Sequence, residues 1–348
     1  MTTVAVLDDY QGCARAHFDK LDPSKYQVAY FPKTLLPWNQ APQTVRDELV
    51  RRLEPFDVIS TMRERTPLPA ELIERLPRLK LILTNAARNK AIDLDACKAR
   101  GIPVASAKDL RTGPVDSTTE HAVAMILGIA RDLAGNDAAI KAGAWQTGFV
   151  TGLSGKTLGL VGLGRLGASV GRIMGLFGMK VQAWSTNLTQ EAADEKARDM
   201  GLPAEGPDGS KTFKAVSRDE LFSTSDVVTV HLVLSDRSRG LITSQDLSQM
   251  KPSAFFVNTS RGPLVVEADL LDAIKARRIA GVAVDVYDVE PLPEDSPWRV
   301  IGGKGQSNVL VTPHIAYVEE TSISGYYKQQ VENLERWTSG EELLNLLS

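Results

Sequence analysis

Short apolar runs alternate with helical spacings along most of the chain. In the first 110 residues, runs rich in Val, Ile and Leu predict strands, and the segments between them have the apolar spacing of amphipathic helices. The predicted strands are residues 4–7, 27–31, 58–61, 79–84 and 104–106, and the predicted helices are residues 44–53, 69–76 and 94–100. This alternation predicts a parallel sheet covered by helices.

A second alternation follows one long helical pattern over residues 117–142, whose apolar positions form a continuous face. The strands predicted after it are residues 158–163, 180–184, 227–232, 254–258, 282–286 and 309–312, with helices near 164–176 and 267–277. Two such alternations in one chain predict an α/β fold with two doubly wound parallel-sheet lobes. We expect the functional site in the cleft between the lobes.

Helical periodicity returns over residues 319–338, where the apolar positions need a partner to cover them. If this segment packs on the first lobe, that lobe is discontinuous in sequence. We therefore predict a first domain of residues 1–116 plus 315–348 and a second domain of residues 117–314. Between the predicted strands of the second lobe, a Gly- and Pro-containing segment over residues 201–216 predicts a surface excursion.

Composition and charge narrow the function. The 348 residues carry a net charge of −3 without a basic block, so the chain lacks the electrostatic footprint of a nucleic-acid binder. The longest apolar stretch, residues 122–130, is far shorter than the roughly 18 residues of a membrane span. No signal peptide precedes the first strand, and Cys13 and Cys97 belong to no metal-binding pattern. We expect a cytoplasmic protein without nucleic-acid, membrane or metal partners.

The apolar face of residues 117–142 predicts a further partner. It is wider than one lobe can cover. We therefore expect these helices to pair across a two-fold axis in a homodimer.

A glycine-rich turn follows the predicted strand at residues 158–161 and opens a helix, which is the context of a dinucleotide-binding site. Gly162 allows the tight turn, Gly164 lets the backbone approach a pyrophosphate, and Gly167 lets the helix sit close to the strand. The phosphate charge then meets the helix N-terminus. The candidate cofactor-binding residues in this turn are Gly162, Gly164, Arg165, Leu166 and Gly167.

The position that separates NAD from NADP departs from the usual pattern. A site selective for NAD carries an acidic residue roughly 20 residues further on, where it binds the ribose hydroxyls. Here Ser185 stands after the second strand, followed by Thr186 and Asn187. These neutral groups do not repel a 2′-phosphate, and no adjacent arginine selects it. The prediction is NADP or NAD, with NADPH used at least as well as NADH.

Three later segments each hold one polar residue in a strand-end or turn setting: residues 258–262 with Arg261, residues 285–291 with Glu290, and residues 312–314 with His314. An arginine, a carboxylate and a histidine downstream of a nicotinamide site can move a hydride and a proton across an α-hydroxy or α-keto acid. A guanidinium fork suits a carboxylate. Histidine titrates near neutrality, and a nearby carboxylate favours its imidazolium form.

With residues 62–66 and 120–124, these segments resemble the D-isomer-specific 2-hydroxyacid dehydrogenase family in order and approximate spacing, over nearly the whole chain. The resemblance implies a Rossmann-type coenzyme domain and a flavodoxin-like substrate domain. It also implies an oxidoreductase that transfers a hydride between a nicotinamide cofactor and a 2-keto acid or D-2-hydroxy acid.

The resemblance also implies roles for single residues. Arg261 would hold the substrate carboxylate and polarise its α-carbonyl, His314 would exchange a proton with the C2 oxygen, and Glu290 would bond to the far nitrogen of His314. Asp285 would contact the nicotinamide carboxamide. His231 ends a predicted strand beside the cofactor crevice, so we expect its backbone to touch the cofactor and its side chain to have a structural role. The further candidate cofactor-binding residues are His231, Leu232, Thr259, Ser260 and Asp285. Nothing suggests chemistry for His17, and a helix-packing role is expected for His121.

The substrate loop departs from the family pattern. Where a glycine-containing turn usually presents backbone amides to the carboxylate, this chain reads Asn85, Ala86 and Ala87. Alanine keeps its N–H but resists positive φ, so a differently shaped pocket is expected. Arg63 and Arg88 are candidates for a second anionic group on the substrate, the alternative being that both are solvated. The candidate substrate-binding residues are Arg63, Asn85, Ala86, Ala87 and Arg261.

Several functions stay open on the sequence. A nucleotide-sensing, corepressor-like binding protein could use the same lobes and keep the same three residues. Formate dehydrogenase is disfavoured because Glu290 stands where those enzymes carry glutamine. A phosphoglycerate dehydrogenase with a regulatory domain is disfavoured because the chain ends soon after the last helix. Reduction of glyoxylate or hydroxypyruvate remains an open possibility for the reaction, as does reduction of a bulkier keto acid.

Overall fold

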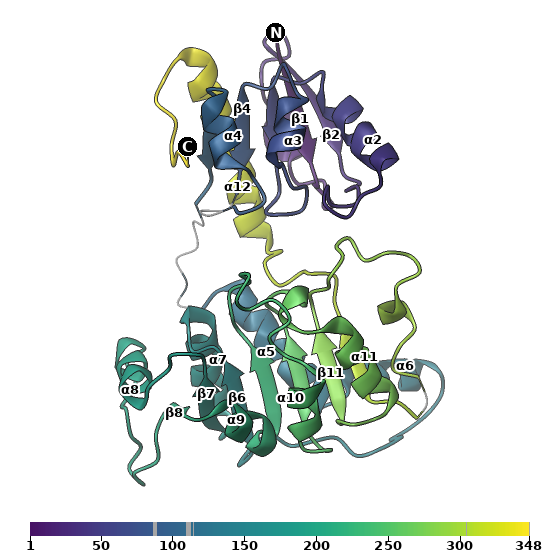
Figure 1. Ribbon diagram of the computed structural model, residues 1–348, viewed down its shortest axis with the longest axis vertical. Coiled ribbons are helices and arrows are strands. Elements are labelled where there is room, and N and C mark those ends of the chain that lie inside the picture. The colour runs from purple at the N-terminus through teal and green to yellow at the C-terminus, as the bar shows by residue number, and fades with distance from the viewer. Residues whose placement is uncertain (86–88, 109–112, 114, 304, 348) are drawn as a thin grey trace. The chain divides into compact units, whose positions relative to one another are not determined.

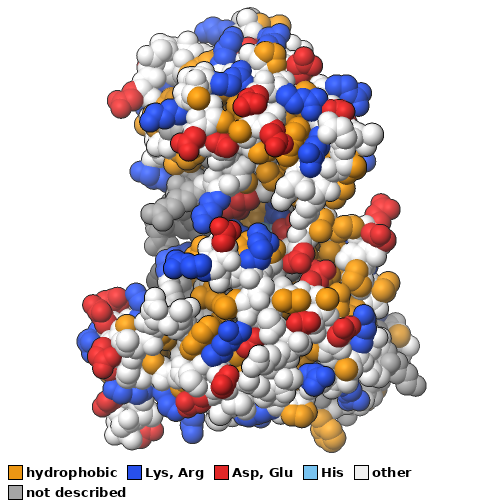
Figure 2. All heavy atoms as spheres, viewed as in Figure 1, with side chains coloured by type: hydrophobic (Ala, Val, Ile, Leu, Met, Phe, Trp, Pro, Cys, Tyr) orange, Lys and Arg blue, Asp and Glu red, His pale blue; other side chains and the backbone are white. Residues whose placement is uncertain are grey.

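The structure is a computed structural model that describes residues 1–85, 89–108, 113, 115–303 and 305–347. It contains two compact units. The first comprises Met1–Thr112, Val289–Pro291 and Val318–Ser348, and the second comprises Gly113–Asp288 and Leu292–Tyr317. Acidic and basic side chains are interspersed on the surface shown in Figure 2, in keeping with the small net charge. Over the described residues, no helix is long and apolar enough to cross a membrane.

The first unit contains a five-stranded parallel sheet in the order β2-β1-β3-β4-β5. Its strands are β1 (Thr2–Leu7), β2 (Tyr26–Phe31), β3 (Val58–Ser60), β4 (Leu81–Thr84) and β5 (Val104–Ser106). Helices α2 (Gln43–Leu53), α3 (Ala70–Glu74) and α4 (Leu94–Ala99) supply the apolar residues that cover one face (Figure 1). Burial on both faces explains why these strands are nearly continuous apolar runs.

The last helix, α12 (Glu320–Ser339), packs in this unit against β4, β5 and the short helix α1 (Arg15–Phe18). The Glu319 carboxylate caps it by accepting from the Thr321 and Ser322 N–H groups at 2.8 Å each, and Gly340 ends it with φ 73°. Its apolar residues Ile323, Tyr326, Tyr327 and Leu334 are buried.

The second unit contains a seven-stranded parallel sheet in the order β12-β11-β10-β9-β6-β7-β8. Its strands are β6 (Thr157–Val161), β7 (Lys180–Trp184), β8 (Lys214–Ala215), β9 (Val227–Val230), β10 (Phe255–Asn258), β11 (Gly281–Val284) and β12 (Asn308–Val311). The two predicted doubly wound α/β sheets are thus confirmed. The two-residue strand β8 was not predicted, because it falls in the segment expected to be a surface excursion.

Six helices cover the two faces of this sheet (Figure 1). One face carries α5 (Ser117–Ala130), α7 (Arg165–Leu176) and α8 (Gln190–Asp199), and the other carries α9 (Arg218–Thr224), α10 (Ser244–Gln249) and α11 (Glu267–Lys275). The prediction of one helix over residues 117–142 was wrong. The chain breaks at Asp132, which has φ 46°, and a separate helix α6 (Leu133–Lys141) follows.

The strand order reverses at β6. From β6 the chain proceeds outward to β7 and β8 on one side, and then returns to β9, β10, β11 and β12 on the other. In an open parallel sheet, ligands bind beyond the carboxyl ends of the strands at such a switch point. The residues after β6 and β9 therefore lie where a ligand is expected to bind.

Candidate active site

The glycine turn after β6 is shaped by its own packing. Gly162 has φ 106°, and a Cβ there would lie 3.0 Å from the His231 carbonyl oxygen. A Cβ at Gly167 would overlap the Gly162 carbonyl oxygen, so the helix can approach the turn only without a side chain. At Gly164, the N-cap of α7, a Cβ would meet nothing within 4 Å, and no side chain caps the helix. These features fit a pyrophosphate held by the first N–H groups of α7.

This geometry separates the roles of two glycines. We expect Gly167→Ala to destabilise the fold by about 1–3 kcal/mol, because the added methyl group forces the helix away from the turn. Gly164→Ala is the matched control: it should leave the melting temperature nearly unchanged and weaken dinucleotide binding. Thermal unfolding and a fluorescence titration with NADPH measure the two effects. Equal melting temperatures for the two variants would contradict this account of the turn.

The predicted cofactor-selecting residue lies beside the glycine turn. The Gly162 N–H donates to the Trp184 carbonyl at 2.8 Å, and Ser185 follows directly. Thr186 and Asn187 are exposed in the turn that comes next. An arginine that the sequence analysis missed, Arg218, lies with its guanidinium 5.4 Å from the centre of the Trp184 ring. Both oxygens of Asp246 accept from this guanidinium, at 2.7 and 2.8 Å, so the charge is already engaged within the protein.

The ends of β9 and β10 complete this region. The His231 N–H donates to the Val161 carbonyl at 2.9 Å, and the Ser260 hydroxyl donates to the Val230 carbonyl at 2.7 Å. Burial lowers the pKa of His231 to about 4, so its ring is neutral near pH 7. The predicted residues His231, Leu232, Thr259 and Ser260 are therefore brought to the same sheet edge as the glycine turn.

Arg261 is held at the turn after β10. The Asn258 side chain accepts a hydrogen bond from the Ser260 N–H at 3.1 Å and donates one to the Arg261 carbonyl at 2.9 Å. The next residue, Gly262, packs so closely on the Tyr287 backbone that a Cβ there would overlap it. The turn that carries Arg261 is thus fixed against the segment after β11. The Arg261 guanidinium, half-buried, donates to the Ser260 carbonyl at 2.7 Å.

Asp285, at the end of β11, has no exposed surface. Its carboxylate accepts from the Thr312 hydroxyl at 2.6 Å, the Ile315 N–H at 2.9 Å and the Ala316 N–H at 3.1 Å. Burial raises the pKa of Asp285, but hydrogen bonds from His121, Thr312 and Ile315 outweigh this effect and leave it below its usual value. Asp285 is therefore a charged anchor, and its predicted contact with a nicotinamide stays a prediction.

His314 lies within the segment that Asp285 anchors. Its backbone has φ 50°, a left-handed conformation, and its ring meets Tyr317 edge-on with centroids 5.7 Å apart. The Tyr287 hydroxyl donates to the Thr312 carbonyl at 2.9 Å and so holds the same segment. Non-glycine residues rarely adopt positive φ, although histidine does so more readily than most. The bonds to Asp285 and Tyr287 account for this conformation.

Glu290 belongs to the first unit, whereas His314 belongs to the second. The Glu290 carboxylate forms an ion pair with Arg65 at 2.6 Å, and the two side chains are only 19% and 8% exposed. No role was predicted for Arg65 from the sequence. The predicted bond between Glu290 and His314 stays a prediction.

The predicted substrate loop follows β4 in the first unit. Asn85 is buried and accepts the Arg63 N–H at 2.6 Å, which holds Arg63 in a left-handed conformation with φ 53°. Asn89 donates to the Arg63 carbonyl at 2.7 Å and to the Thr84 hydroxyl at 3.0 Å. This role of Asn89 in holding the loop was not predicted from the sequence. Two buried side chains thus tie together the segments that follow β3 and β4. Ala86, Ala87 and Arg88 lie outside the described residues.

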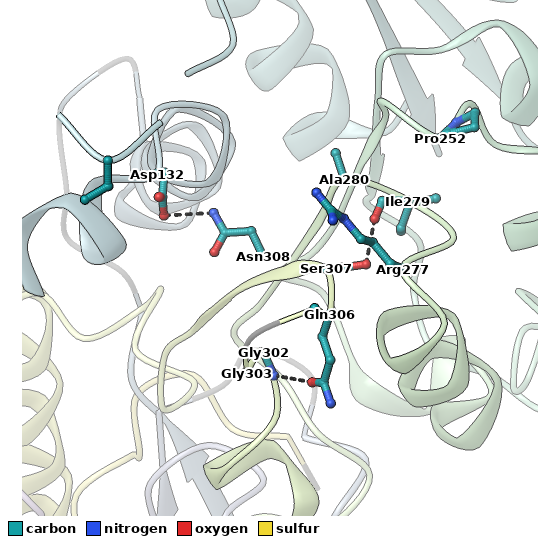
Figure 3. Close-up of a pocket in the computed structure, with 12 residues that line it drawn as sticks. Asp132, Pro252, Arg277, Ile279, Ala280, Gly302, Gly303, Gln306, Ser307 and Asn308 are labelled. Carbon is teal, nitrogen blue, oxygen red and sulfur yellow. Dashed lines mark hydrogen bonds between the residues drawn. The ribbon is translucent and has the colours of Figure 1, made fainter. Parts of the chain in front are cut away.

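A separate polar cavity of about 780 Å³ lies in the second unit (Figure 3). It is lined by residues at or just before the starts of β10, β11 and β12, among them Pro252, Ala280 and Asn308, together with Asp132. Asn308 donates to Asp132 at 2.9 Å across its wall. The cavity is thus at the amino ends of these strands, opposite the edge that carries Arg261 and His314.

The topology, the glycine turn and the polar residues along one sheet edge define a dinucleotide-binding protein of the Rossmann class. A family model described as "D-isomer specific 2-hydroxyacid dehydrogenase, NAD binding domain" matches residues 123–316. The chain belongs to the D-isomer-specific 2-hydroxyacid dehydrogenase family, which confirms the resemblance seen in the sequence.

Similar proteins cover most of the chain. The crystal structure of a phosphoglycerate oxidoreductase from Vibrio cholerae O395 aligns with a TM-score of 0.81 and 33% identity, covering 98% of this chain and 100% of that one. A hydroxypyruvate reductase from Blautia hydrogenotrophica is 29% identical over 85% of this chain and 87% of its own length. A D-3-phosphoglycerate dehydrogenase from Archaeoglobus fulgidus is 35% identical over 78% of this chain, but only 47% of that protein is covered.

Proposed function

We propose that this oxidoreductase is an NAD(P)-dependent D-2-hydroxyacid dehydrogenase that reduces a small 2-keto acid of the glyoxylate or hydroxypyruvate type. One observation carries the proposal: Arg261 follows β10 and His314 follows β12, on the same edge of one parallel sheet as the glycine turn after β6. The similarity to a hydroxypyruvate reductase supports the substrate class. A bulkier keto acid is the second candidate, since the loop at Asn85 lacks the family's glycine.

In this proposal the protein binds, orients and protonates the substrate. The bound nicotinamide supplies the hydride that reduces C2. The Arg261 fork receives the substrate carboxylate through two parallel charge-assisted hydrogen bonds and draws electron density from the adjacent carbonyl. The His314 imidazolium gives its proton to the C2 oxygen as the carbonyl becomes an alcohol, and it takes the proton back in the reverse reaction. Glu290 bonds to the far nitrogen of His314 and orients its ring toward the substrate.

The domain roles follow from the same proposal. Residues 117–314 form the dinucleotide-binding domain, and residues 1–116 plus 315–348 form the substrate domain, with the exception that Val289–Pro291 lie in the first compact unit. The cofactor set comprises Gly162, Gly164, Arg165, Leu166, Gly167, Ser185, Thr186, Asn187, His231, Leu232, Thr259, Ser260 and Asp285. The substrate set comprises Arg63, Asn85, Ala86, Ala87 and Arg261.

A keto-acid screen tests the function. Purified protein is incubated with glyoxylate, hydroxypyruvate and bulkier 2-keto acids, each with NADH and NADPH, and cofactor oxidation is followed. We expect turnover with at least one small 2-keto acid. Tight NADPH or NADH binding without turnover on any keto acid would favour the corepressor-like alternative instead.

Cofactor preference gives a sharper prediction. We expect wild-type protein to use NADPH at least as well as NADH, because the neutral Ser185 does not repel a 2′-phosphate. Ser185→Asp should shift the preference toward NADH by about 1–3 kcal/mol, the value of one charge-assisted hydrogen bond. Ser185→Asn is the uncharged control and should shift it little. The ratio of kcat/KM for the two cofactors, at fixed ionic strength, measures the shift. A strong wild-type preference for NADH would refute this view of Ser185.

We also propose a homodimer, on a different basis from the sequence argument. The apolar face of α5 is buried within its own unit by α7 and the sheet. Large apolar side chains are instead exposed on α6 and just after it: Leu133 (60%), Ile140 (51%), Trp145 (76%) and Phe149 (fully exposed). Large exposed apolar side chains concentrated in one short segment support a protein interface there.

Sedimentation velocity tests the dimer. Wild-type protein should sediment at twice the 37.8 kDa chain mass at micromolar concentration, and Trp145→Glu should shift it toward monomer. Leu176→Glu changes an exposed apolar residue at the end of α7 and serves as the control. It should leave the sedimentation of the dimer unchanged. A wild-type species of 37.8 kDa alone would contradict the proposal.

A further inference from the structure

His121 on α5 contacts the polar group that anchors the His314 segment. Its Nε2 lies 3.1 Å from the Thr312 hydroxyl oxygen and 3.4 Å from the nearer Asp285 carboxylate oxygen. The Thr312 hydroxyl donates to that same carboxylate oxygen at 2.6 Å. Because the hydroxyl hydrogen is used there, the oxygen of Thr312 can only accept from His121. The geometry therefore places a hydrogen on Nε2 of His121.

We infer that His121 is a positioning residue, which acts through Thr312 and Asp285 to hold the segment carrying His314. The expected effect on catalysis rests on the proposed function. The expected effect on the structure of the segment does not, because the four residues concerned all lie in the second unit, namely His121, Asp285, Thr312 and His314. A helix-packing histidine would direct its ring at apolar neighbours, whereas this ring is directed at a hydroxyl and a buried carboxylate.

A short series of hydrogen bonds connects His121 to the segment that carries His314. Asp285 has no access to water, and the backbone N–H groups of Ile315 and Ala316, directly after His314, donate to it at 2.9 and 3.1 Å. Loss of the Thr312 hydroxyl removes one donor from the buried carboxylate directly, and loss of His121 removes the donor that holds the Thr312 hydroxyl in place. In either case Asp285 holds the segment less firmly. Small displacements of a catalytic group can reduce turnover by about 100-fold.

The test compares two disruptive variants with two conservative ones. Thr312→Val removes the bridging hydroxyl at nearly constant volume, and His121→Ala removes the ring, which is only 19% exposed. Thr312→Ser keeps the hydroxyl, and His121→Gln keeps an N–H donor. Hydrogen exchange of the segment 312–317 is measured by mass spectrometry, with kcat and the KM for NADPH measured in parallel.

We expect both disruptive variants to exchange about 5- to 10-fold faster in this segment, the effect of one hydrogen bond. Their kcat should fall by about 10- to 100-fold, with the KM for NADPH unchanged, and the conservative variants should largely restore both properties. Unchanged exchange in this segment would overturn the inference, even if kcat falls. If the wild-type protein has no turnover, the proposed function fails, whereas the exchange measurement still decides this inference.

Discussion

Replacement of His314 is expected to have the largest effect of any single change, a loss of about 10²–10⁴-fold in kcat, because a general acid contributes that much. His314→Asn is the cleaner variant. Asparagine tolerates the left-handed backbone at φ 50°, so it removes the imidazole ring without adding the strain that Ala would bring. Binding of NADPH should stay nearly intact, since the glycine turn after β6 is unchanged.

The control for this variant is His17→Asn. His17 forms a hydrogen bond with Ser324 at 2.9 Å in the first unit and has no part in the proposed reaction. The His17→Asn variant should retain full activity. Steady-state kinetics and a fluorescence titration with NADPH measure the two properties. A kcat near the wild-type value in His314→Asn would remove His314 from the mechanism.

Arg261→Lys should reduce kcat/KM by about 10- to 150-fold, the equivalent of one charge-assisted hydrogen bond of about 1.5–3 kcal/mol. A lysine keeps the charge, but its ammonium cannot reproduce the planar fork that binds a carboxylate bidentately. The loss should therefore appear in both KM for the keto acid and kcat. It should not appear in cofactor affinity.

Arg277→Lys is the matched control for this prediction. Arg277 is exposed at the cavity beside the amino ends of the strands (Figure 3), so it should behave as wild type in the same assay. Wild-type KM and kcat in Arg261→Lys would show that the guanidinium geometry is not used, and the substrate-binding role would have to be assigned elsewhere.

The two sheets could be predicted because parallel strands are buried on both faces and read as apolar runs. The exceptions have physical causes. Strand β8 has only two residues, too few for any periodicity. The contact between Arg218 on α9 and Trp184 joins residues far apart in sequence and has no local sequence signal. The helix break at Asp132 depends on one left-handed residue, a conformation that asparagine, aspartate and histidine adopt only occasionally.

The polar contacts around the candidate site could not be predicted from local pattern. The residue types were visible, since Thr312 and His314 stand together and Asp285 ends a strand. However, the bond between Thr312 and Asp285 spans 27 positions, that between His121 and Thr312 spans 191, and the Arg65–Glu290 ion pair spans 225. Such pairings depend on which strands become neighbours. His121 was consequently interpreted as a packing residue, and Arg65 was given no role.

The configuration of the product tests the central claim most directly. Hydroxypyruvate, or another accepted 2-keto acid whose product is chiral, is reduced with NADPH, and the hydroxy acid is analysed by chiral chromatography against D and L standards. We predict the D-isomer alone, formed in equal amount to the cofactor oxidised. The L-isomer, a racemate, or cofactor oxidation without any hydroxy acid would contradict the assignment of this protein as a D-2-hydroxyacid dehydrogenase.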